Sequence, residues 1–447
     1  MSLHEPIASR PARFIRGLIE KFAGLGTTVG ASARLALRER ETRTLTELCR
    51  ALLSERGEAS GIALAVDGLA RYRALEPAER VRFFDALARE FSPDPAQVAK
   101  HADAYTRDPS QGHLVLLQKA VESPRQELFR RLNMAPGGTA ALVELRRELL
   151  AELDKNPELV GVDTDLQHLF TSWFNRGFLE LRRIDWNTPA AVLEKLIKYE
   201  AVHAMQGWED LRRRLDRDRR CFAFFHPALP DEPLIFVEVA LVEGIAEAVG
   251  PLLAADKISD ASKANTAIFY SITNCQDGLR GVSFGSFLIK QVAAELGREL
   301  PRVRTFATLS PIPGFRRWLE SERGRLGAEH AALLARDDWS SEEAAVATLK
   351  EPLSRLCAWY LLHAKRGKTG LPLDPVGRFH LANGASLERV NWLADTSAKG
   401  VRESCTLMVN YLYDLDAIER NHDAYANGDP IIAAHRVEAL AAKAPGA

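Results

Sequence analysis

Apolar residues recur at helical spacing through the first third of the chain. Segments such as LTELCRALLSERG, ERVRFFDALAREF and AALVELRRELLAEL place leucine, alanine and phenylalanine three or four positions apart, which predicts amphipathic helices. SPDPAQ and NMAPGGT interrupt this pattern with the proline and glycine residues at which helices end or begin. We therefore predict an all-helical bundle domain over residues 1–170, without a recognisable chemical motif.

The pattern changes after residue 170. RCFAFFHP, PLIFVEVALV, TAIFYSITN and RVRTFATL are short runs rich in aromatic and β-branched residues and bounded by Pro, Asp or Asn, which predicts strands. Between the last two, GVSFGSFLIKQVAAELGREL has helical periodicity from Phe284 onward. A strand, a glycine-containing loop, a helix and a strand form a βαβ unit. Residues 171–447 are therefore predicted to form a mixed α/β domain with further helices near its end.

Composition supports this division and narrows the possible partners. A chain of 447 residues is too long to fold around one ordinary hydrophobic core, so two or more domains are expected. Its content of 46% hydrophobic and 27% charged residues is typical of folded globular proteins. The net charge of -1 gives no reason to expect nucleic acid or an anionic membrane surface as a partner. The longest strand-like run, PLIFVEVALV, is too short to span a bilayer and contains Glu238.

Five cysteines are scattered along the chain, without a CxxC pair. This pattern is neither a disulfide framework nor a zinc site, and it favours a reducing compartment. The N-terminal segment SRPARFIRGLIEKF surrounds an apolar stripe with basic residues, which allows two interpretations. It resembles an organellar presequence, but Glu5 and Glu20 favour a first amphipathic helix.

A glycine-rich loop lies where the strand TAIFYSITN gives way to a helix. Gly278, Gly281 and Gly285 stand in NCQDGLRGVSFGS, where backbone N–H groups and a helix N-terminus can bind an oxyanion such as a pyrophosphate. The spacing matches neither GxGxxG nor the GK[ST] of nucleotide hydrolases. On spacing alone, a tight strand–helix connection is the favoured interpretation.

Ser310 ends an apolar run in FATLSPIPGFRRWL and is followed by two prolines and a probable helix. It is either an ordinary capped turn or a reactive hydroxyl held on a rigid loop. His380, His203 and His226 are each either a structural histidine or a catalytic one. HExxH and EF-hand motifs are absent from the sequence, and no nucleophile-elbow GxSxG surrounds a plausible serine. We therefore expect chemistry without a metal.

Three phrases together resemble the malonyl-CoA decarboxylase family: AIFYSITNCQDGLRGVSFGSFLIKQVAAEL, TLSPIPGFRRWL and FHLANGASLERVNWLAD. The likeness extends from about residue 170 to about residue 415 in the same order. It implies that the second domain has a GNAT-type acyltransferase-like fold that binds coenzyme A at a strand-to-helix loop. The implied coenzyme A-binding residues are Arg280, Gly281, Val282, Ser283, Phe284, Gly285 and Ser286.

The same resemblance implies the catalytic residues. The family's serine matches Ser310 and its histidine matches His380, and its tyrosine matches Tyr411 or Tyr413 in MVNYLYDL, of which we prefer Tyr413. Animal members of the family have a glutamate at the position of Ser283, so any role of that carboxylate is dispensable here or filled by another group. Lys290 is a candidate for the 3′-phosphate, although a solvated helix face is the favoured interpretation.

The implied reaction converts malonyl-CoA to acetyl-CoA and CO2. The thioester carbonyl itself accepts the electrons left by CO2 as an enolate, so neither a metal nor an organic cofactor is expected. The protein must bind coenzyme A, stabilise the oxyanion and deliver a proton. Ser310 is expected to orient the malonyl carboxylate and His380, whose ordinary pKa is near neutral, to protonate the enolate. The reverse assignment, with His380 polarising the thioester and Ser310 relaying the proton, stays open.

The resemblance also carries expectations about assembly and location. A homodimer or homotetramer is expected, with the helical domain as its natural interface. The chain ends in AAKAPGA rather than SKL, which favours a bacterial-type cytoplasmic enzyme, with an organelle as the alternative. Two other functions stay open: an acyl-CoA thioesterase or acyltransferase on the same fold, in which Ser310 and His380 form a nucleophile–base pair, and a non-catalytic acyl-CoA sensor.

Overall fold

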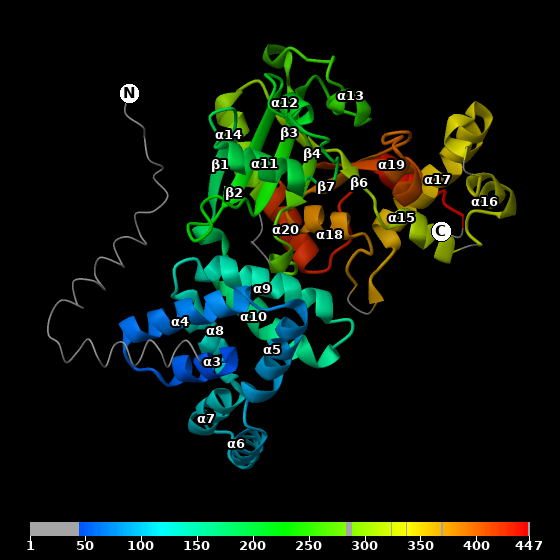
Figure 1. The fold of residues 1–447 in the computed structure, drawn as a ribbon. Coiled ribbons are helices and arrows are strands. Elements are labelled where there is room, and N and C mark those ends of the chain that lie inside the picture. The colour runs from blue at the N-terminus through cyan, green and yellow to red at the C-terminus, as the bar shows by residue number, and fades with distance from the viewer. Residues whose placement is uncertain (1–43, 283–287, 323, 337, 368–369, 446–447) are drawn as a thin grey trace, which may run out of the picture. The chain divides into compact units, whose positions relative to one another are not determined.

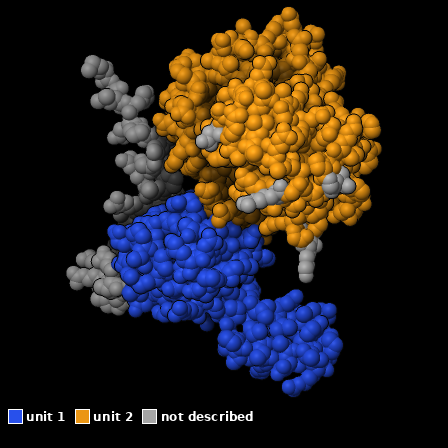
Figure 2. Space-filling view, turned by 90° about the vertical axis from the view of Figure 1, so that its right-hand side faces the viewer, with its two compact units in different colours: residues 1–169 blue, residues 170–447 orange. Residues whose placement is uncertain are grey.

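The computed structural model describes residues 44–282, 288–322, 324–336, 338–367 and 370–445 (Figure 1). The chain divides into two units, residues 1–169 and 170–447 (Figure 2). The predicted N-terminal amphipathic helix lies outside the described residues, as do the loop positions Ser283, Phe284, Gly285 and Ser286.

Helices form the first unit, as the apolar periodicity predicts. The described helices are α3 (Leu45–Ser54), α4 (Glu58–Arg73), α5 (Pro77–Glu90), α6 (Pro95–Arg107), α7 (Gln111–Val121), α8 (Pro124–Asn133), α9 (Gly138–Glu152) and the start of α10 (Val160–Trp173). Local sequence fixes several of these boundaries. Thr44 and Glu47 form a capping box on α3, and α5, α6 and α8 each begin with a proline in the first turn.

The core of this unit lies between α3, α4, α5, α8 and α9. Phe84, Phe129 and Leu142 are almost completely buried there, which is the main stabilising contribution such a bundle can make. In contrast, neither α6 nor α7 has a buried residue, and the two helices project together from the rest of the bundle (Figure 1). None of the helices in the described part of the chain is long and apolar enough to cross a bilayer.

The second unit contains a mixed sheet in the order β1-β2-β3-β4-β5-β8-β6, with β7 also paired to β8. Its strands are β1 (Glu180–Ile184), β2 (Arg219–Phe225), β3 (Ile235–Val242), β4 (Thr266–Asn274), β5 (Thr305–Thr308), β6 (Ser310–Pro311), β7 (Ser386–Asn391) and β8 (Met408–Leu412). Strands β1 to β4 are antiparallel neighbours, whereas β4 and β5 are parallel. A parallel pair needs a crossover connection, and helix α14 lies within that connection.

Further helices surround this sheet (Figure 1). They are the end of α10, α11 (Ala190–Tyr199), α12 (Trp208–Arg214), α13 (Gly250–Leu253), α14 (Leu288–Glu299), α15 (Phe315–Ser321), α16 (Ala328–Leu334), α17 (Glu343–His363), α18 (Pro375–Ala382), α19 (Ala398–Ser404), α20 (Ile418–Ala426) and α21 (His435–Ala441). The predicted fold class is confirmed: a helical region precedes a mixed α/β domain with the strand–loop–helix–strand unit expected of the GNAT type.

Strand β4 contains an irregularity that matters for the site. Glu238 of β3 pairs with Ser271, but the next residue, Val239, pairs with Phe269. Tyr270 is therefore the extra residue of a β-bulge, a feature that bends a strand and changes the direction of its side chains. The bulge lies beside β5, because the N–H of Leu309 donates to the carbonyl of Phe269 at 3.0 Å.

Candidate active site

Ser310 lies where β5 gives way to β6, and both strands pair with β8 in one antiparallel register. Ala307 pairs with Leu412 of β8, and Ser310 pairs with Val409 of the same strand. Pro311 can take part in this edge because a proline is tolerated where no ladder N–H is needed. Ser310 itself is buried, with 5% of its surface exposed. The sequence expectation of a hydroxyl on a strand end beside prolines agrees with this geometry.

A buried amide holds the segment that leads to Ser310. The side-chain Nδ2 of Asn410 donates to the carbonyl oxygen of Thr308 at 2.6 Å and to that of Ala246 at 3.1 Å. Its Oδ1 accepts from the Nδ2 of Asn391 at 2.8 Å. A buried carbonyl without a partner is costly. Because the N–H of Tyr411 donates to the Thr308 side chain instead, Asn410 supplies the donor to the Thr308 carbonyl.

Helix α18 brings His380 against Ser310. Asp374 caps its start by accepting from the N–H of Gly377 at 2.7 Å, and His380 lies in its last turn. The imidazole Nε2 is 3.0 Å from Ser310 Oγ, and Nδ1 is 2.8 Å from the hydroxyl of Tyr413. Three residues that are far apart in the sequence thus form one line of hydrogen bonds.

Both candidate tyrosines contact His380, each in a different way. Residues two apart near a strand share a face, which explains why Tyr411 and Tyr413 both reach the imidazole. Tyr411 stacks on it with ring centroids 4.7 Å apart and an interplanar angle of 27°. Tyr413 supplies the hydroxyl to Nδ1. Among the described residues, the Tyr411 hydroxyl has no hydrogen-bond partner.

Burial sets the charge state of this group. It lowers the pKa of His380 from 6.5 to about 3 and raises the pKa values of Tyr411 and Tyr413 well above 10, because desolvation disfavours the charged form. At neutral pH all three side chains are uncharged. The ordinary near-neutral pKa on which the sequence expectation for His380 rests is thus lowered by burial in the free protein, and any proton that His380 gives comes from a neutral imidazole.

A cavity of about 210 Å³ opens beside Ser310 and His380. Most of its lining is apolar, and none of the described residues that line it carries a formal charge at neutral pH. The lining residues are Val202, Phe269, Tyr270, Ile272, Asn274, Ser310, Pro311, Pro375, Val376, Phe379 and His380. We refer to this space as the acyl cavity. A short polar group placed in it would meet neutral hydrogen-bond donors in an environment of low polarity.

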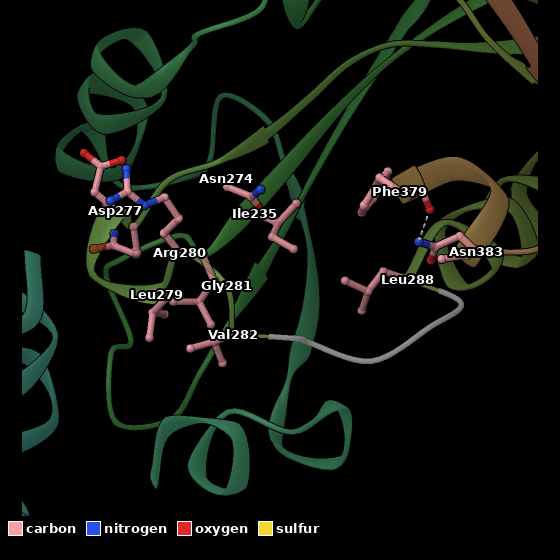
Figure 3. A pocket seen from close by; sticks show the side chains of 13 residues that line it. Ile235, Asn274, Asp277, Leu279, Arg280, Gly281, Val282, Leu288, Phe379 and Asn383 are labelled. Atoms are coloured by element: carbon pink, nitrogen blue, oxygen red, sulfur yellow. Dashed lines mark hydrogen bonds between the residues drawn. The ribbon is translucent and has the colours of Figure 1, made fainter. Parts of the chain in front are cut away.

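A second cavity, of about 450 Å³, lies at the glycine-containing loop, and we refer to it as the loop cavity. Figure 3 shows Leu279, Arg280, Gly281 and Val282 on one side and Phe379 with Asn383 across from them. Its other lining residues are Leu234, Ile235, Asn274, Gln276, Asp277, Leu288 and Ala382. The structure thus places the described part of the predicted loop, Arg280 to Val282, at a cavity.

The two cavities share Asn274 and Phe379, so they are neighbouring parts of one site. Sequence reasoning missed both residues. Their sequence signals are weak: Asn274 is the polar residue that ends strand β4, and Phe379 directly precedes His380. Sequence reasoning also missed Thr308, which stands two positions before Ser310 and shares its strand face.

The other candidate residues lie elsewhere. His226 bonds through Nε2 to the carbonyl of Trp173 at 3.1 Å, and Lys290 forms an ion pair with Glu419 at 2.5 Å. His203 lines neither cavity, and all five cysteines are buried and free. In the described ranges, no group of three or more His, Cys, Asp or Glu side chains is arranged to hold a metal ion.

Comparison with known proteins identifies relatives along most of the chain. Residues 177–446 match the family model described as malonyl-CoA decarboxylase C-terminal domain, and residues 91–174 match the corresponding N-terminal domain. The mitochondrial malonyl-CoA decarboxylase of Anser anser anser is 38% identical over 408 residues, covering 82% of this chain and 81% of the relative. That of Rattus norvegicus is 35% identical over 433 residues, covering 88% of each.

Solved structures agree with these matches. The malonyl-CoA decarboxylase of Rhodopseudomonas palustris is 52% identical with a TM-score of 0.85, covering 88% of this chain and 98% of the other. That of Agrobacterium vitis is 49% identical with a TM-score of 0.83, covering 89% and 99%.

Proposed function

The chain belongs to the malonyl-CoA decarboxylase family, and we propose that Ser310 and His380 convert malonyl-CoA to acetyl-CoA and CO2 in its second unit. The observation that carries this proposal is the pair of neighbouring cavities: the loop at one, Ser310 and His380 at the other, and Asn274 with Phe379 common to both. A long ligand with a handle and a short reactive end fits such a site.

The loop cavity would hold the coenzyme A handle. Gly281 has a φ of 80°, a left-handed conformation that glycine adopts without strain and that turns backbone N–H groups toward a bound anion. Arg280 lines the same cavity and supplies a positive charge for phosphate. Ser283 to Ser286, which complete the proposed loop, lie outside the described residues.

The acyl cavity would hold the malonyl group against Ser310. A hydroxyl that donates to the malonyl carboxylate orients it so that the breaking C–C bond is aligned with the thioester π system. An uncharged, largely apolar lining gives the carboxylate no cation to bind. Loss of CO2 moves the C–C electron pair into the thioester carbonyl, so the localised charge becomes a delocalised enolate. This is the state that such surroundings favour over the carboxylate.

His380 would then assist protonation of the enolate carbon through Ser310. Protein hydroxyls occupy both imidazole nitrogens, so the shortest route from His380 to the acyl group passes through Ser310 Oγ. Ser310 would give its proton to the carbon, the Nε2–H of His380 would give one to Ser310, and Nδ1 would take the proton of Tyr413, so that the imidazole stays neutral. Solvent restores the single proton that each turnover consumes. Tyr413, bound to Nδ1, would orient the ring during this transfer.

The test is to incubate the purified chain, treated with chelator, with malonyl-CoA and to follow CO2, acetyl-CoA and free coenzyme A separately. We expect equal amounts of CO2 and acetyl-CoA, and a decrease in kcat of about 10²- to 10⁴-fold in Ser310→Ala and in His380→Asn. His226→Asn, outside both cavities, is the matched control and should keep the activity of the unmodified chain.

Other products would contradict the proposal in different ways. Free coenzyme A without CO2 would indicate a thioesterase or acyltransferase in which Ser310 is a nucleophile. Binding of coenzyme A without turnover would indicate a sensor.

We further propose a cytoplasmic homo-oligomer. The five free cysteines suit a reducing compartment, although some relatives are mitochondrial by name. We propose the helical unit as the interface of a homodimer or homotetramer. Light scattering of the purified chain would measure its mass, and a monomer would contradict the proposal.

A further inference from the structure

Ser310 has a second hydrogen-bond partner besides His380. Its hydroxyl donates to Thr308 Oγ1 at 2.8 Å, and its oxygen is 3.0 Å from His380 Nε2. A serine hydroxyl has one proton and two lone pairs. Because the heavy-atom geometry makes Ser310 the donor to Thr308, Ser310 can only accept from His380. The Nε2 atom of His380 must therefore carry the imidazole proton.

The opposite side of the imidazole is consistent with this tautomer. A neutral histidine has one donor and one acceptor nitrogen, and burial keeps His380 neutral. With the proton on Nε2, Nδ1 accepts from the Tyr413 hydroxyl at 2.8 Å. The hydrogen bonds then run in one direction, from Tyr413 to His380, on to Ser310 and finally to Thr308.

The surroundings of Thr308 make it an acceptor. Its Oγ1 also accepts from the backbone N–H of Tyr411 at 3.1 Å, so its two lone pairs are used by Tyr411 and Ser310. Its carbonyl is held by Asn410, and Thr308 and Asn410 are both fully buried. These contacts fix the Thr308 hydroxyl oxygen next to Ser310.

We propose that Thr308 is a positioning residue that keeps the Ser310 proton away from His380 and so makes Ser310 a proton donor rather than a nucleophile. A serine nucleophile must hand its proton to a base whose lone pair faces the hydroxyl, but here a N–H of His380 faces it. When a malonyl carboxylate enters the acyl cavity, it replaces Thr308 as the acceptor. This inference rests on the proposed function, because it assigns the direction of proton movement in that reaction.

The tautomer can be measured in the intact free protein. Nitrogen-15 NMR of the chain labelled at histidine, with the His380 signals assigned by their loss in His380→Asn, distinguishes a protonated ring nitrogen from an unprotonated one. At neutral pH we expect a protonated Nε2 and an unprotonated Nδ1. A proton on Nδ1 alone, or on both nitrogens, would overturn the inference, and this measurement needs no variant of Thr308.

Two variants of Thr308 test its role directly. Thr308→Val keeps the shape but removes the acceptor, so the Ser310 proton should turn to Nε2 and the imidazole proton should move to Nδ1. We expect kcat for CO2 release to fall about tenfold or more, because Ser310 would then face a lone pair of His380 and could not receive a proton from it. Thr308→Ser restores the acceptor and should return both the tautomer and, within about threefold, the kcat.

The matched control is Thr266→Val, which removes another buried threonine hydroxyl, on β4 and outside both cavities. It should change neither tautomer nor kcat. If Thr308→Val keeps the original tautomer and kcat, the role of Thr308 is refuted while decarboxylation stands. If the unmodified chain releases no CO2, the proposed function fails, and the tautomer measurement still reports on the hydrogen-bond direction.

Discussion

His380 couples the stability of the protein to pH, because the pKa of its imidazole is lowered in the folded protein and has its ordinary value in the unfolded chain. A free histidine has a pKa of about 6.5, whereas burial lowers the pKa of His380 to about 3. Between these values the unfolded chain binds a proton that the folded chain does not. The free energy of unfolding therefore decreases as the pH falls through this window.

We predict that lowering the pH from about 7.5 to about 5.5 costs the unmodified chain about 1 kcal/mol more stability than it costs His380→Asn. Urea unfolding at both pH values measures the difference. His435→Asn is the matched control, because the His435 side chain is 95% exposed, and it should keep the pH dependence of the unmodified chain. Equal losses in the unmodified chain and in His380→Asn would contradict the prediction.

The site residues differ in how far the sequence could predict them. Ser310 and His380 came from the family resemblance, because a serine before proline and a histidine after phenylalanine are individually ordinary. The family resemblance allowed Tyr411 or Tyr413, with Tyr413 preferred, and both share one face of the chain. Only the fold assigns stacking to one and a hydrogen bond to the other. The role proposed for Thr308 depends on the direction of a hydrogen bond, and a pattern of residues in the sequence does not contain that information.

Helix α18 depends on a glycine at its end to hold His380 in place. Gly384 has a φ of 81°, and a Cβ at this position would lie 2.0 Å from the carbonyl oxygen of Ile418. The carbonyl carbon of Ile418 would also lie 2.9 Å away, and these backbone atoms cannot move aside as a flexible side chain can. We predict that Gly384→Ala lowers the free energy of unfolding by about 3 kcal/mol or more, because it combines backbone strain with a steric clash.

Gly428→Ala separates these two causes. Gly428 has nearly the same φ, 79°, but a Cβ there would meet no atom within 4 Å. It should cost only the left-handed backbone penalty, about 1–2 kcal/mol. Urea unfolding followed by circular dichroism compares the two variants. Equal losses would show that the contact with Ile418 is not what requires glycine at Gly384.

Elements were predictable from the sequence where local pattern decides them. Strands β2 to β5 and the bundle helices follow from apolar spacing, proline and glycine. The pairing of β8 with both β5 and β6, and the bulge at Tyr270, were not predictable. The pairings of β8 depend on contacts between segments about a hundred residues apart, such as the hydrogen bond from Asn410 to Thr308. The bulge depends on how β4 pairs with β3.

At the scale of the whole molecule, the proposed function assigns binding of coenzyme A to one cavity of the second unit and the chemistry to the other. Arg280 lines only the loop cavity, and Ser310 lines only the acyl cavity. Interactions that are equal in the ground state and the transition state change KM, whereas interactions made only in the transition state change kcat. Substitutions in the loop cavity should therefore change KM, and substitutions of Ser310 or His380 in the acyl cavity should change kcat.

We predict that Arg280→Gln raises the KM for malonyl-CoA about tenfold and changes kcat less than about twofold. The substitution removes a positive charge of the protein that would bind the phosphates of coenzyme A. The effect should shrink at high salt, which screens an exposed charge. Lys290→Gln is the matched control: Lys290 pairs with Glu419 and lines neither cavity, so its KM should stay within about twofold. Ser310→Ala should show the opposite pattern, with kcat lowered and coenzyme A binding retained. If Arg280→Gln lowered kcat as much as Ser310→Ala does, Arg280 would act in the chemical step, and the proposed separation of coenzyme A binding from catalysis would be wrong.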